Sequence, residues 1–316
     1  MTKFNPKVYF KKNNLVLAPM AGYTDIGFRH LCREYGAGLV FTEMISVKAI
    51  LHNNEKTLQL MSSTEDEHPI ALQLFGNDPK DFEEVMKRPE IGHFDVIDIN
   101  MGCPAPKIVK NGEGSALLEN LDHAREIIRR VVKFSQKPVS VKFRSGVDAN
   151  HKIYLEFAKM CEEEGVSFIT FHPRTREQGY SGRADWEQIK EVTQIVKIPV
   201  VASGDVLTNF DFRYLMQECG ASAVMIGRGA IGNPEIFSEI RGILKEPLPL
   251  SEKIVQIEKH INWLQKYFSK NFISSEMKKH ILGYVKSFNG AVEMKKKIAI
   301  IKDIDECIKI LKDYAN

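Results

Sequence analysis

The stretch DINMGCPAPKIVKNGEGSALL, residues 98–118, contains the features around which the rest of the chain can be interpreted. A largely apolar run over residues 96–99 leads into it and predicts a buried strand. Cys103 follows between Gly102 and Pro104, and these neighbours are typical of a turn. Enzymes of the α/β class keep their chemistry in loops at strand ends. We therefore expect the Cys103 thiol to face a cleft; the alternative for a cysteine is a small buried apolar side chain.

Seven other short apolar runs resemble the one before Cys103, and helical patterns separate most of them. The eight predicted strands cover residues 15–20, 39–44, 70–75, 95–101, 138–143, 168–172, 199–202 and 223–226. They recur about every 25–30 residues, which is the spacing of βαβ units. Eight units in about 240 residues match a TIM (β/α)8 barrel in count and length. An open doubly wound sheet is disfavoured because no GxGxxG motif follows the first strand.

Helical patterns fill the segments between these strands. We predict helices over residues 25–35, 48–60, 122–134, 152–164, 185–196 and 210–218, and one that begins at Asp78-Pro79. The barrel domain is expected to span residues 1–240, and Pro247-Leu248-Pro249 is expected to be a linker. The second domain, residues 241–316, is predicted to be small and all-helical, with Ser251 as a cap and breaks at Gly283 and Asn289-Gly290.

Composition limits the class of protein. The chain has 316 residues, of which 43% are hydrophobic, so it can bury a sizeable core. It has no apolar run long enough for a membrane span and no apolar signal segment near residue 1. Its five cysteines are scattered without a CxxC pair, which argues against a zinc site or a disulfide framework. We therefore expect a cytoplasmic protein with no metal and no membrane partner.

The positive charge is concentrated near the C-terminus. Residues 241–316 contain 15 Lys and Arg against 9 Asp and Glu, a net of +6, so the other 240 residues sum to −3. This asymmetry favours a polyanionic partner for the C-terminal domain. A lysine-rich helix surface that contacts only water is the alternative.

The predicted strand ends carry polar and glycine residues that a barrel brings together on one face. They are Pro19-Met20-Ala21, Glu43, Gln73, Asn100 with Cys103, Lys142 with Arg144, His172 with Arg174, Ser203-Gly204-Asp205 and Gly227-Arg228. The last two groups follow strands 7 and 8, where such barrels commonly bind phosphate. We expect Arg228 and His172 to add charge to that phosphate. Each residue alone also has a structural explanation, so the prediction depends on their coincidence.

These motifs closely resemble those of the tRNA-dihydrouridine synthases, FMN enzymes that reduce uridine in tRNA, and in particular the bacterial B-type members. The resemblance includes APMAGYTDIGFR (18–29), TEM (42–44), LQLFGNDP (72–79), residues 98–118, VKFRSG (141–146), FHPRTREQGYSGRADW (171–186), SGD (203–205) and MIGRGAIGNPEIF (225–237). It covers most of the predicted barrel, whereas the C-terminal extension is similar only in being helical and basic. Ser203 stands where the family usually has Asn, and Pro173 stands where it often has Gly.

The resemblance implies a role for each strand end. Cys103 would be the proton donor. The FMN site would comprise Pro19, Met20 and Ala21 along the flavin, Gln73 and Lys142 at the isoalloxazine ring, and Ser203, Gly204, Asp205, Gly227 and Arg228 with His172 at the phosphate end. Asn100 would touch flavin or uracil, Arg144 would face the substrate base, and Arg174 would meet the flavin phosphate or the RNA.

The implied reaction reduces the C5=C6 bond of uracil. Reduced FMN would deliver a hydride to C6, a thiol that is neutral near pH 7 would give a proton to C5, and NADPH or NADH would reduce FMN again. The target uridine must be flipped out of its stack, and the basic helical domain would contact tRNA phosphates. We expect a monomer. The alternatives are a dihydroorotate-dehydrogenase-like enzyme for a free pyrimidine, which needs no basic extension, and a tRNA-binding or chaperone-like protein, which needs no flavin.

Overall fold

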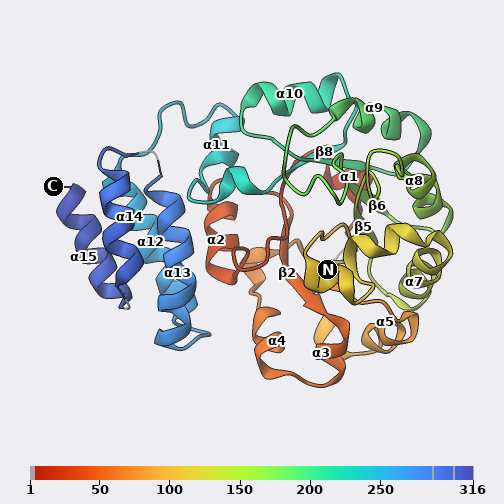
Figure 1. The fold of residues 1–316 in the computed structure, drawn as a ribbon, viewed down its shortest axis with the longest axis horizontal. Helices are drawn as coiled ribbons and strands as arrows, with labels where there is room; N and C mark the ends of the chain where they lie inside the picture. Colours follow the sequence, from red (N-terminus) through yellow and green to blue (C-terminus); the bar gives the residue numbers. More distant parts are fainter. Residues whose placement is uncertain (1–3, 287, 302, 316) are drawn as a thin grey trace.

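The computed structural model describes residues 4–286, 288–301 and 303–315 (Figure 1). Within these ranges eight parallel strands follow one another in the order β1-β8-β7-β6-β5-β4-β3-β2. Their bounds are β1 Leu15–Leu17, β2 Val40–Ser46, β3 Ile70–Phe75, β4 Val96–Met101, β5 Val139–Arg144, β6 Phe168–His172, β7 Val200–Ser203 and β8 Ala223–Ile226. The Leu17 N–H donates to Leu39 O at 2.9 Å, which joins β1 to the chain just before β2. The sheet therefore closes into the predicted TIM barrel.

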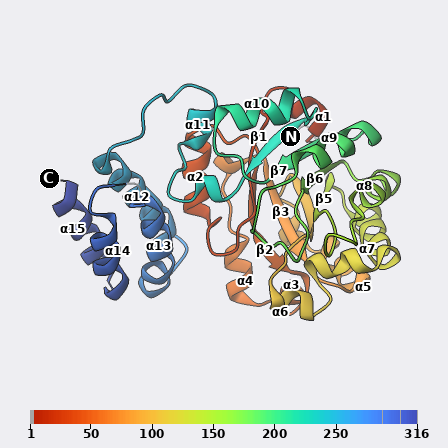
Figure 2. The same ribbon diagram turned by 45° about the horizontal axis from the view of Figure 1, so that its top comes forward.

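Helices surround the barrel in the expected alternation (Figures 1 and 2). They are α2 Ile26–Glu34, α3 Val47–Leu51, α4 Glu55–Leu60, α5 Pro79–Met86, α6 Pro106–Lys110, α7 Leu121–Phe134, α8 Tyr154–Glu163, α9 Trp186–Ile195, α10 Asn209–Gln217 and α11 Ile236–Ile240. The single helix predicted over residues 48–60 is wrong: it is broken into α3 and α4. Asn53, at a φ of 51°, lies at the break, and Asn54 begins the second helix by accepting from the Thr57 N–H at 3.1 Å.

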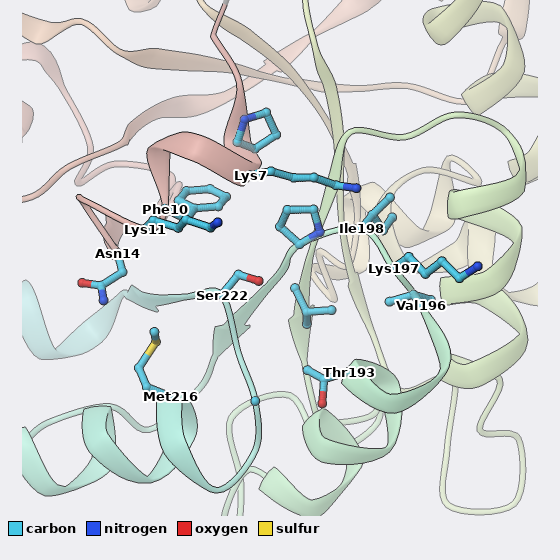
Figure 3. A pocket seen from close by; sticks show the side chains of 14 residues that line it. Lys7, Phe10, Lys11, Asn14, Thr193, Val196, Lys197, Ile198, Met216 and Ser222 are labelled. Carbon is cyan, nitrogen blue, oxygen red and sulfur yellow. The ribbon is translucent and has the colours of Figure 1, made fainter.

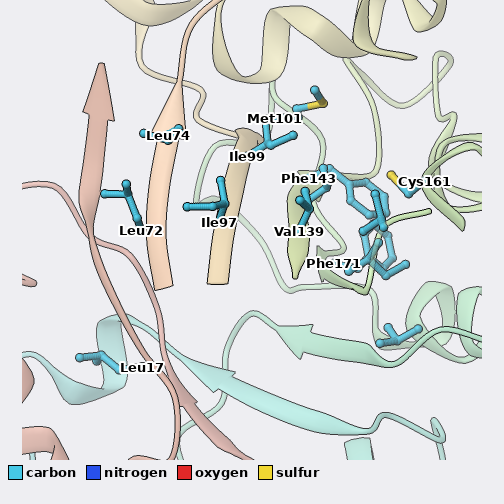
Figure 4. Close-up of a cluster of buried hydrophobic side chains, with 14 of the residues drawn as sticks. Leu17, Leu72, Leu74, Ile97, Ile99, Met101, Val139, Phe143, Cys161 and Phe171 are labelled. Carbon is cyan, nitrogen blue, oxygen red and sulfur yellow. The ribbon is translucent and has the colours of Figure 1, made fainter. Parts of the chain in front are cut away.

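Successive side chains along each strand point alternately outward, toward the helices, and inward, toward the barrel axis. Outward side chains such as Leu72, Ile97 and Phe143 pack under the helices as the main apolar core (Figure 4). Inward side chains form a second apolar cluster near the N-terminal ends of the strands, including Val96 and Phe168. Farther along the same inward face the residues become polar. The inward-facing residues at the carboxyl ends of the strands therefore form the polar lining of the open end of the barrel.

A short helix, α1 (Pro6–Tyr9), lies at the N-terminal ends of the strands, in a segment for which no helix was predicted. Phe10 follows it and packs edge-on against Phe168, with ring centroids 5.3 Å apart. These rings lie at the end of the barrel opposite the polar lining. This end therefore has a structural role.

The C-terminal domain consists of α12 Leu250–Leu264, α13 Lys270–Tyr284, α14 Ala291–Ile300 and α15 Ile304–Ala315. It has its own apolar core, which includes Ile257 and Met277. In both ribbon views it lies beside α2 and α11 of the barrel. The prediction of a helical second domain agrees with this arrangement for the described residues. None of the described helices is long and apolar enough to cross a membrane.

Two details of that domain differ from prediction. Helix α12 begins at Leu250 after Pro249, so Ser251 lies inside its first turn and is not the cap. Gly283 is the penultimate residue of α13, which ends at Tyr284, so the predicted break falls one residue later. A Cβ at Gly283 would stand only 3.3 Å from Gly232 N, and one at Gly232 would stand 2.2 Å from Gly283 C. The glycines therefore permit close contact between the two domains.

Candidate active site

Two adjoining cavities open at the carboxyl ends of the strands, each of about 400 Å³. Both are lined by Pro19, Met20, Lys142, His172, Tyr180 and Arg228. The first also contains Ala21, Gln73, Asn100, Cys103 and Arg144, and the second contains Ser203, Gly204, Asp205 and Gly227. The structure thus brings fourteen of the fifteen sequence-predicted site residues to one continuous site. Arg174 lines neither cavity.

The backbone around Cys103 is held on both sides. The Cys103 N–H donates to Asn100 Oδ1 at 2.9 Å, and the Cys103 carbonyl accepts from Ser115 N–H at 3.1 Å and Ser115 Oγ at 2.9 Å. Gly114 has a φ of 61°, and a Cβ there would lie 2.9 Å from the Cys103 carbonyl oxygen. These contacts fix the loop, while the Cys103 side chain remains partly exposed in the cavity. The expectation that the thiol faces a cleft is confirmed.

Lys142 is a half-buried cation that lines both cavities. Among the described residues its ammonium has no carboxylate oxygen within 4.0 Å, although the charge of Asp98 acts on it from farther away and raises its pKa. Burial, followed by repulsion from Arg144, lowers the pKa of Lys142 to about 8. An unpaired cation beside Gln73 and Asn100 is suited to an electron-rich, hydrogen-bonding ring. The residues present therefore fit the flavin that the sequence suggested.

His172 lies between the two cavities, and its predicted contact with a phosphate stays a prediction. It is buried, and burial together with the neighbouring cations, first Lys142 and then Arg144, lowers the pKa of His172 well below its usual range. The environment of the ring therefore disfavours its protonated form. Its packing instead explains the adjacent glycine: a Cβ at Gly204, where φ is 116°, would lie 2.8 Å from His172 Cδ2.

The second cavity has the character of an anion site. Arg228 is half exposed, and its Nη2 donates to Asp205 Oδ1 at 3.0 Å. Asp205 also accepts from the Ala184 N–H at 2.8 Å and therefore orients Arg228 from a fixed position. The cavity wall includes Lys286, which follows α13 in the helical domain. Sequence reasoning missed Lys286 because only tertiary docking brings it to the barrel.

The two remaining arginines donate hydrogen bonds to carbonyl groups of the loops around the site. Arg144 is buried and donates to the carbonyls of Gly102, Thr175 and Gly179 at 2.7–3.1 Å, although it still borders the first cavity. Arg174 is buried too and donates to the carbonyls of Ser181 and Gly182 and to Asp205 Oδ2. Its predicted contact with phosphate or RNA is not supported, because its donors are used within the protein.

Tyr180 is a cavity residue that the sequence analysis did not single out. It is 57% exposed, and the guanidinium of Arg228 lies 4.6 Å from the centroid of its ring. The guanidinium of Arg144 lies 5.4 Å from the same centroid. An exposed aromatic ring between two guanidinium groups provides a surface on which a planar base can stack. Tyr180 lies within the quoted motif of residues 171–186, but nothing in that motif distinguished it from its neighbours.

A different cavity, of about 550 Å³, lies at the opposite end of the barrel (Figure 3). It is lined by exposed Lys7, Lys11 and Lys197 together with the start of β7. Figure 3 shows these lysines on the chain around α1 and after α9. None of the sequence-predicted site residues lines this cavity, so we assign the active site to the other end of the barrel.

Asp25, His260 and His280 form a buried cluster between the two domains, and their nearest ligand atoms all lie within 4.8 Å of one another. His260 Nε2 lies 2.7 Å from Asp25 Oδ1, and His280 Nε2 lies 3.3 Å from Asp25 Oδ2. Asp25 Oδ1 also accepts from the Phe28 N–H and so caps α2. The hydrogen bond from His260 and the cap on α2 both use Asp25 Oδ1, whereas His280 Nε2 lies beside Asp25 Oδ2 without forming a hydrogen bond among the described residues.

Comparison with known proteins identifies the class that this fold and site define. The family model described as "Dihydrouridine synthase (Dus)" matches residues 16–315. The chain belongs to this family, and its relatives place it with the bacterial B-type members.

One relative, tRNA-dihydrouridine synthase B of Proteus vulgaris, is 35% identical over 97% of this chain and 96% of its own. The tRNA-dihydrouridine synthase B of Vibrio cholerae is also 35% identical, over 97% of each chain. A probable tRNA-dihydrouridine synthase of Rickettsia bellii is 37% identical over 92% of this chain and 91% of its own.

Solved structures support the fold alone. Histamine dehydrogenase from Rhizobium superposes with a TM-score of 0.59 at 15% identity, over 79% of this chain and 49% of that chain. The old yellow enzyme homologue from Zymomonas mobilis gives 0.55 at 14% identity, over 77% of this chain and 92% of that chain.

Proposed function

We propose that this protein is a flavin-dependent tRNA-dihydrouridine synthase that reduces the C5=C6 bond of uridines in tRNA. The observation that carries the proposal is the position of Cys103, which borders the same cavity as Gln73 and Lys142. Family membership and relatives of nearly equal length support the assignment. The proposed site residues are the cavity residues named above; Arg174 is retained only as a residue that supports the loops.

The proposed cofactor is FMN, with its ring near Gln73 and Lys142 and its phosphate near Gly227, Arg228 and Ser203. When bound, FMN supplies the hydride that uracil C6 receives, and NADPH or NADH is the proposed reductant. Lys142 stabilises negative charge on the ring while its ammonium is protonated. Lys286 adds a cation to the phosphate end.

Cys103 provides the proton that reaches uracil C5. Its fixed backbone and partly exposed side chain allow the thiol to meet a base that enters the cavity. A positioned general acid contributes roughly 10²–10⁴-fold to such a step. Tyr180 offers a stacking surface for the flipped base, which must leave its helical stack to enter the barrel.

The helical domain supplies the proposed tRNA contacts. Its net charge of +6 and the exposed Lys296 and Lys297 on α14 support this role. The test is to titrate the purified protein with tRNA and with a free pyrimidine, and to record its visible spectrum. Flavin absorbance with tRNA-dependent oxidation of the reduced flavin is expected. A colourless protein, or turnover of the free pyrimidine alone, would contradict the proposal.

A further inference from the structure

Asp98 is a buried carboxyl group inside the barrel, and the roles proposed above do not use it. Its Oδ1 accepts from Ser140 Oγ at 2.6 Å, and its Oδ2 accepts from Gln73 Nε2 at 2.7 Å. Strand register places the three residues side by side, since Gln73 of β3 pairs with Asp98 of β4 and Asp98 with Ser140 of β5. A buried carboxyl group is costly unless its hydrogen bonds are well made, so its position calls for an explanation.

The hydrogen bonds continue from Asp98 to the Cys103 loop. Gln73 Oε1 accepts from Asn100 Nδ2 at 2.9 Å. Asn100 Oδ1 in turn accepts from the N–H groups of Gly102 at 3.1 Å and Cys103 at 2.9 Å. A continuous series of hydrogen bonds therefore runs from Ser140 through Asp98, Gln73 and Asn100 to the backbone of Cys103.

This series has a fixed direction. Backbone N–H groups can only donate, so Asn100 must turn its oxygen toward the Cys103 loop and its NH₂ group toward Gln73. Gln73 must then present its oxygen to Asn100 and its NH₂ group to Asp98. Asp98 is an acceptor that can end the series. Neither amide can be flipped without placing two donors, or two acceptors, against each other.

We propose that Asp98 is a positioning residue for the flavin site, because its acceptor oxygen holds the Gln73 amide in one orientation. Gln73 lines the cavity, and each of its amide atoms retains a second hydrogen-bonding valence. The fixed amide therefore offers one donor and one acceptor, at defined positions, to the edge of a bound ring. The inference rests on the proposed function in one respect, namely that this ring is the isoalloxazine of FMN.

The arrangement works in both protonation states of Asp98. Burial raises the pKa of Asp98 to about 7, and the hydrogen bonds from Ser140 and Gln73 and the charge of Lys142 oppose this rise. A protonated Asp98 can still accept from Gln73 through its carbonyl oxygen while its O–H donates to Ser140 Oγ. The acceptor is therefore the essential property, and the charge is not. An asparagine at this position reproduces the protonated form.

The experiment compares FMN binding to apoprotein of wild type, Asp98→Asn, Asp98→Leu and the control Ser140→Ala. Affinity is measured by quenching of FMN fluorescence, and the visible absorption spectrum of the bound flavin reports its hydrogen-bonding environment. Asp98→Asn and Ser140→Ala should bind within roughly threefold of wild type with an unchanged spectrum. Asp98→Leu should bind roughly tenfold or more weakly with a shifted spectrum, because the Gln73 amide loses its acceptor.

Two results would overturn the inference. One is an Asp98→Leu protein that binds FMN with wild-type affinity and spectrum. The other is an Asp98→Asn protein as impaired as Asp98→Leu, because charge would then be the essential property. Should Asp98→Leu not fold, as judged by circular dichroism, Asp98→Ala replaces it in both comparisons. Failure of the wild-type protein to bind FMN would refute the proposed function itself, whereas these two results leave FMN binding by the wild type intact.

Discussion

Asp25 in the barrel and His260 in the helical domain are joined by a 2.7 Å contact between buried atoms. Although burial opposes ionisation, His260 and then His280 hold the pKa of Asp25 well below its usual range. The same carboxylate caps α2, only four residues after the end of the Pro19–Ala21 segment that lines the cavity. One side chain therefore contributes both to domain docking and to the start of the helix that follows the cavity wall.

Replacing Asp25 with alanine should weaken the docking of the helical domain. The variant loses a helix cap, worth about 1 kcal/mol, and leaves a buried ring nitrogen unpaired at a cost of about 1–3 kcal/mol. The measurement is urea denaturation together with limited proteolysis of the 241–249 linker. Asp25→Asn, which retains an acceptor oxygen, is the matched control and should lose less than half as much stability. Indistinguishable unfolding of Asp25→Ala and wild type would contradict this role.

Cys103→Ala should retain its fold and flavin but lose turnover by roughly 10²–10⁴-fold, because it removes the proton donor and leaves the rest of the cavity intact. Single-turnover oxidation of the reduced flavin by tRNA measures this step. Cys161→Ala is the control, since Cys161 is buried in the outer core and should leave the rate unchanged. A wild-type rate in Cys103→Ala would exclude Cys103 as the acid.

FMN affinity should fall as the pH rises above about 8. The lowered pKa of Lys142 means that its ammonium is present below about pH 8 and is lost above it. Because FMN binding favours the charged form, affinity should decrease by at most about tenfold per pH unit in that range. Lys142→Met should bind more weakly at pH 7 and lose this dependence.

Arg228→Met provides the comparison for Lys142. Arginine stays charged throughout the range, so this variant should lower affinity without altering the pH profile. A Lys142→Met protein with full flavin occupancy and the wild-type profile would refute the placement of the ring.

Reversing the charges of Lys295, Lys296 and Lys297 to Glu should weaken tRNA binding and reduce its salt dependence. Each lost phosphate contact lowers the slope of log K against log salt by roughly 0.7–0.9. The matched control reverses Lys7, Lys11 and Lys197, which surround the cavity at the far end of the barrel. That control should leave the slope close to wild type. Superimposable slopes for the α14 variant and wild type would show that these lysines only face solvent.

Much of the barrel could be predicted because eight apolar runs recur at βα spacing and the strand ends carry the chemistry. The structural roles that could not be predicted depend on tertiary contacts. Gly283 was expected to break a helix, and α13 does end one residue after it, but the close approach of Gly283 to Gly232 could not be predicted. His172 was expected to add charge, yet burial and the neighbouring Lys142 and Arg144 lower its pKa, which depends on contacts that the sequence does not show.

For two residues of the site the sequence predicted the position but not the contacts. Arg174 lies in a specific motif, but its burial could not be inferred from that motif. Asp98 was visible as the first residue of the opening stretch, yet its link to Gln73 depends on the register between β3 and β4. Strand alternation alone would have placed the side chains of Gln73 and Asp98 inside the barrel, but not next to each other.

The most direct test of the account is dihydrouridine formation in unmodified tRNA by the purified protein with FMN and NADPH or NADH. Mass spectrometry of the digested tRNA should reveal uridines that have gained two hydrogens, at defined positions, and Cys103→Ala should form far fewer of them. If the flavin-loaded wild-type protein leaves every uridine unreduced while binding the tRNA, the central claim is contradicted.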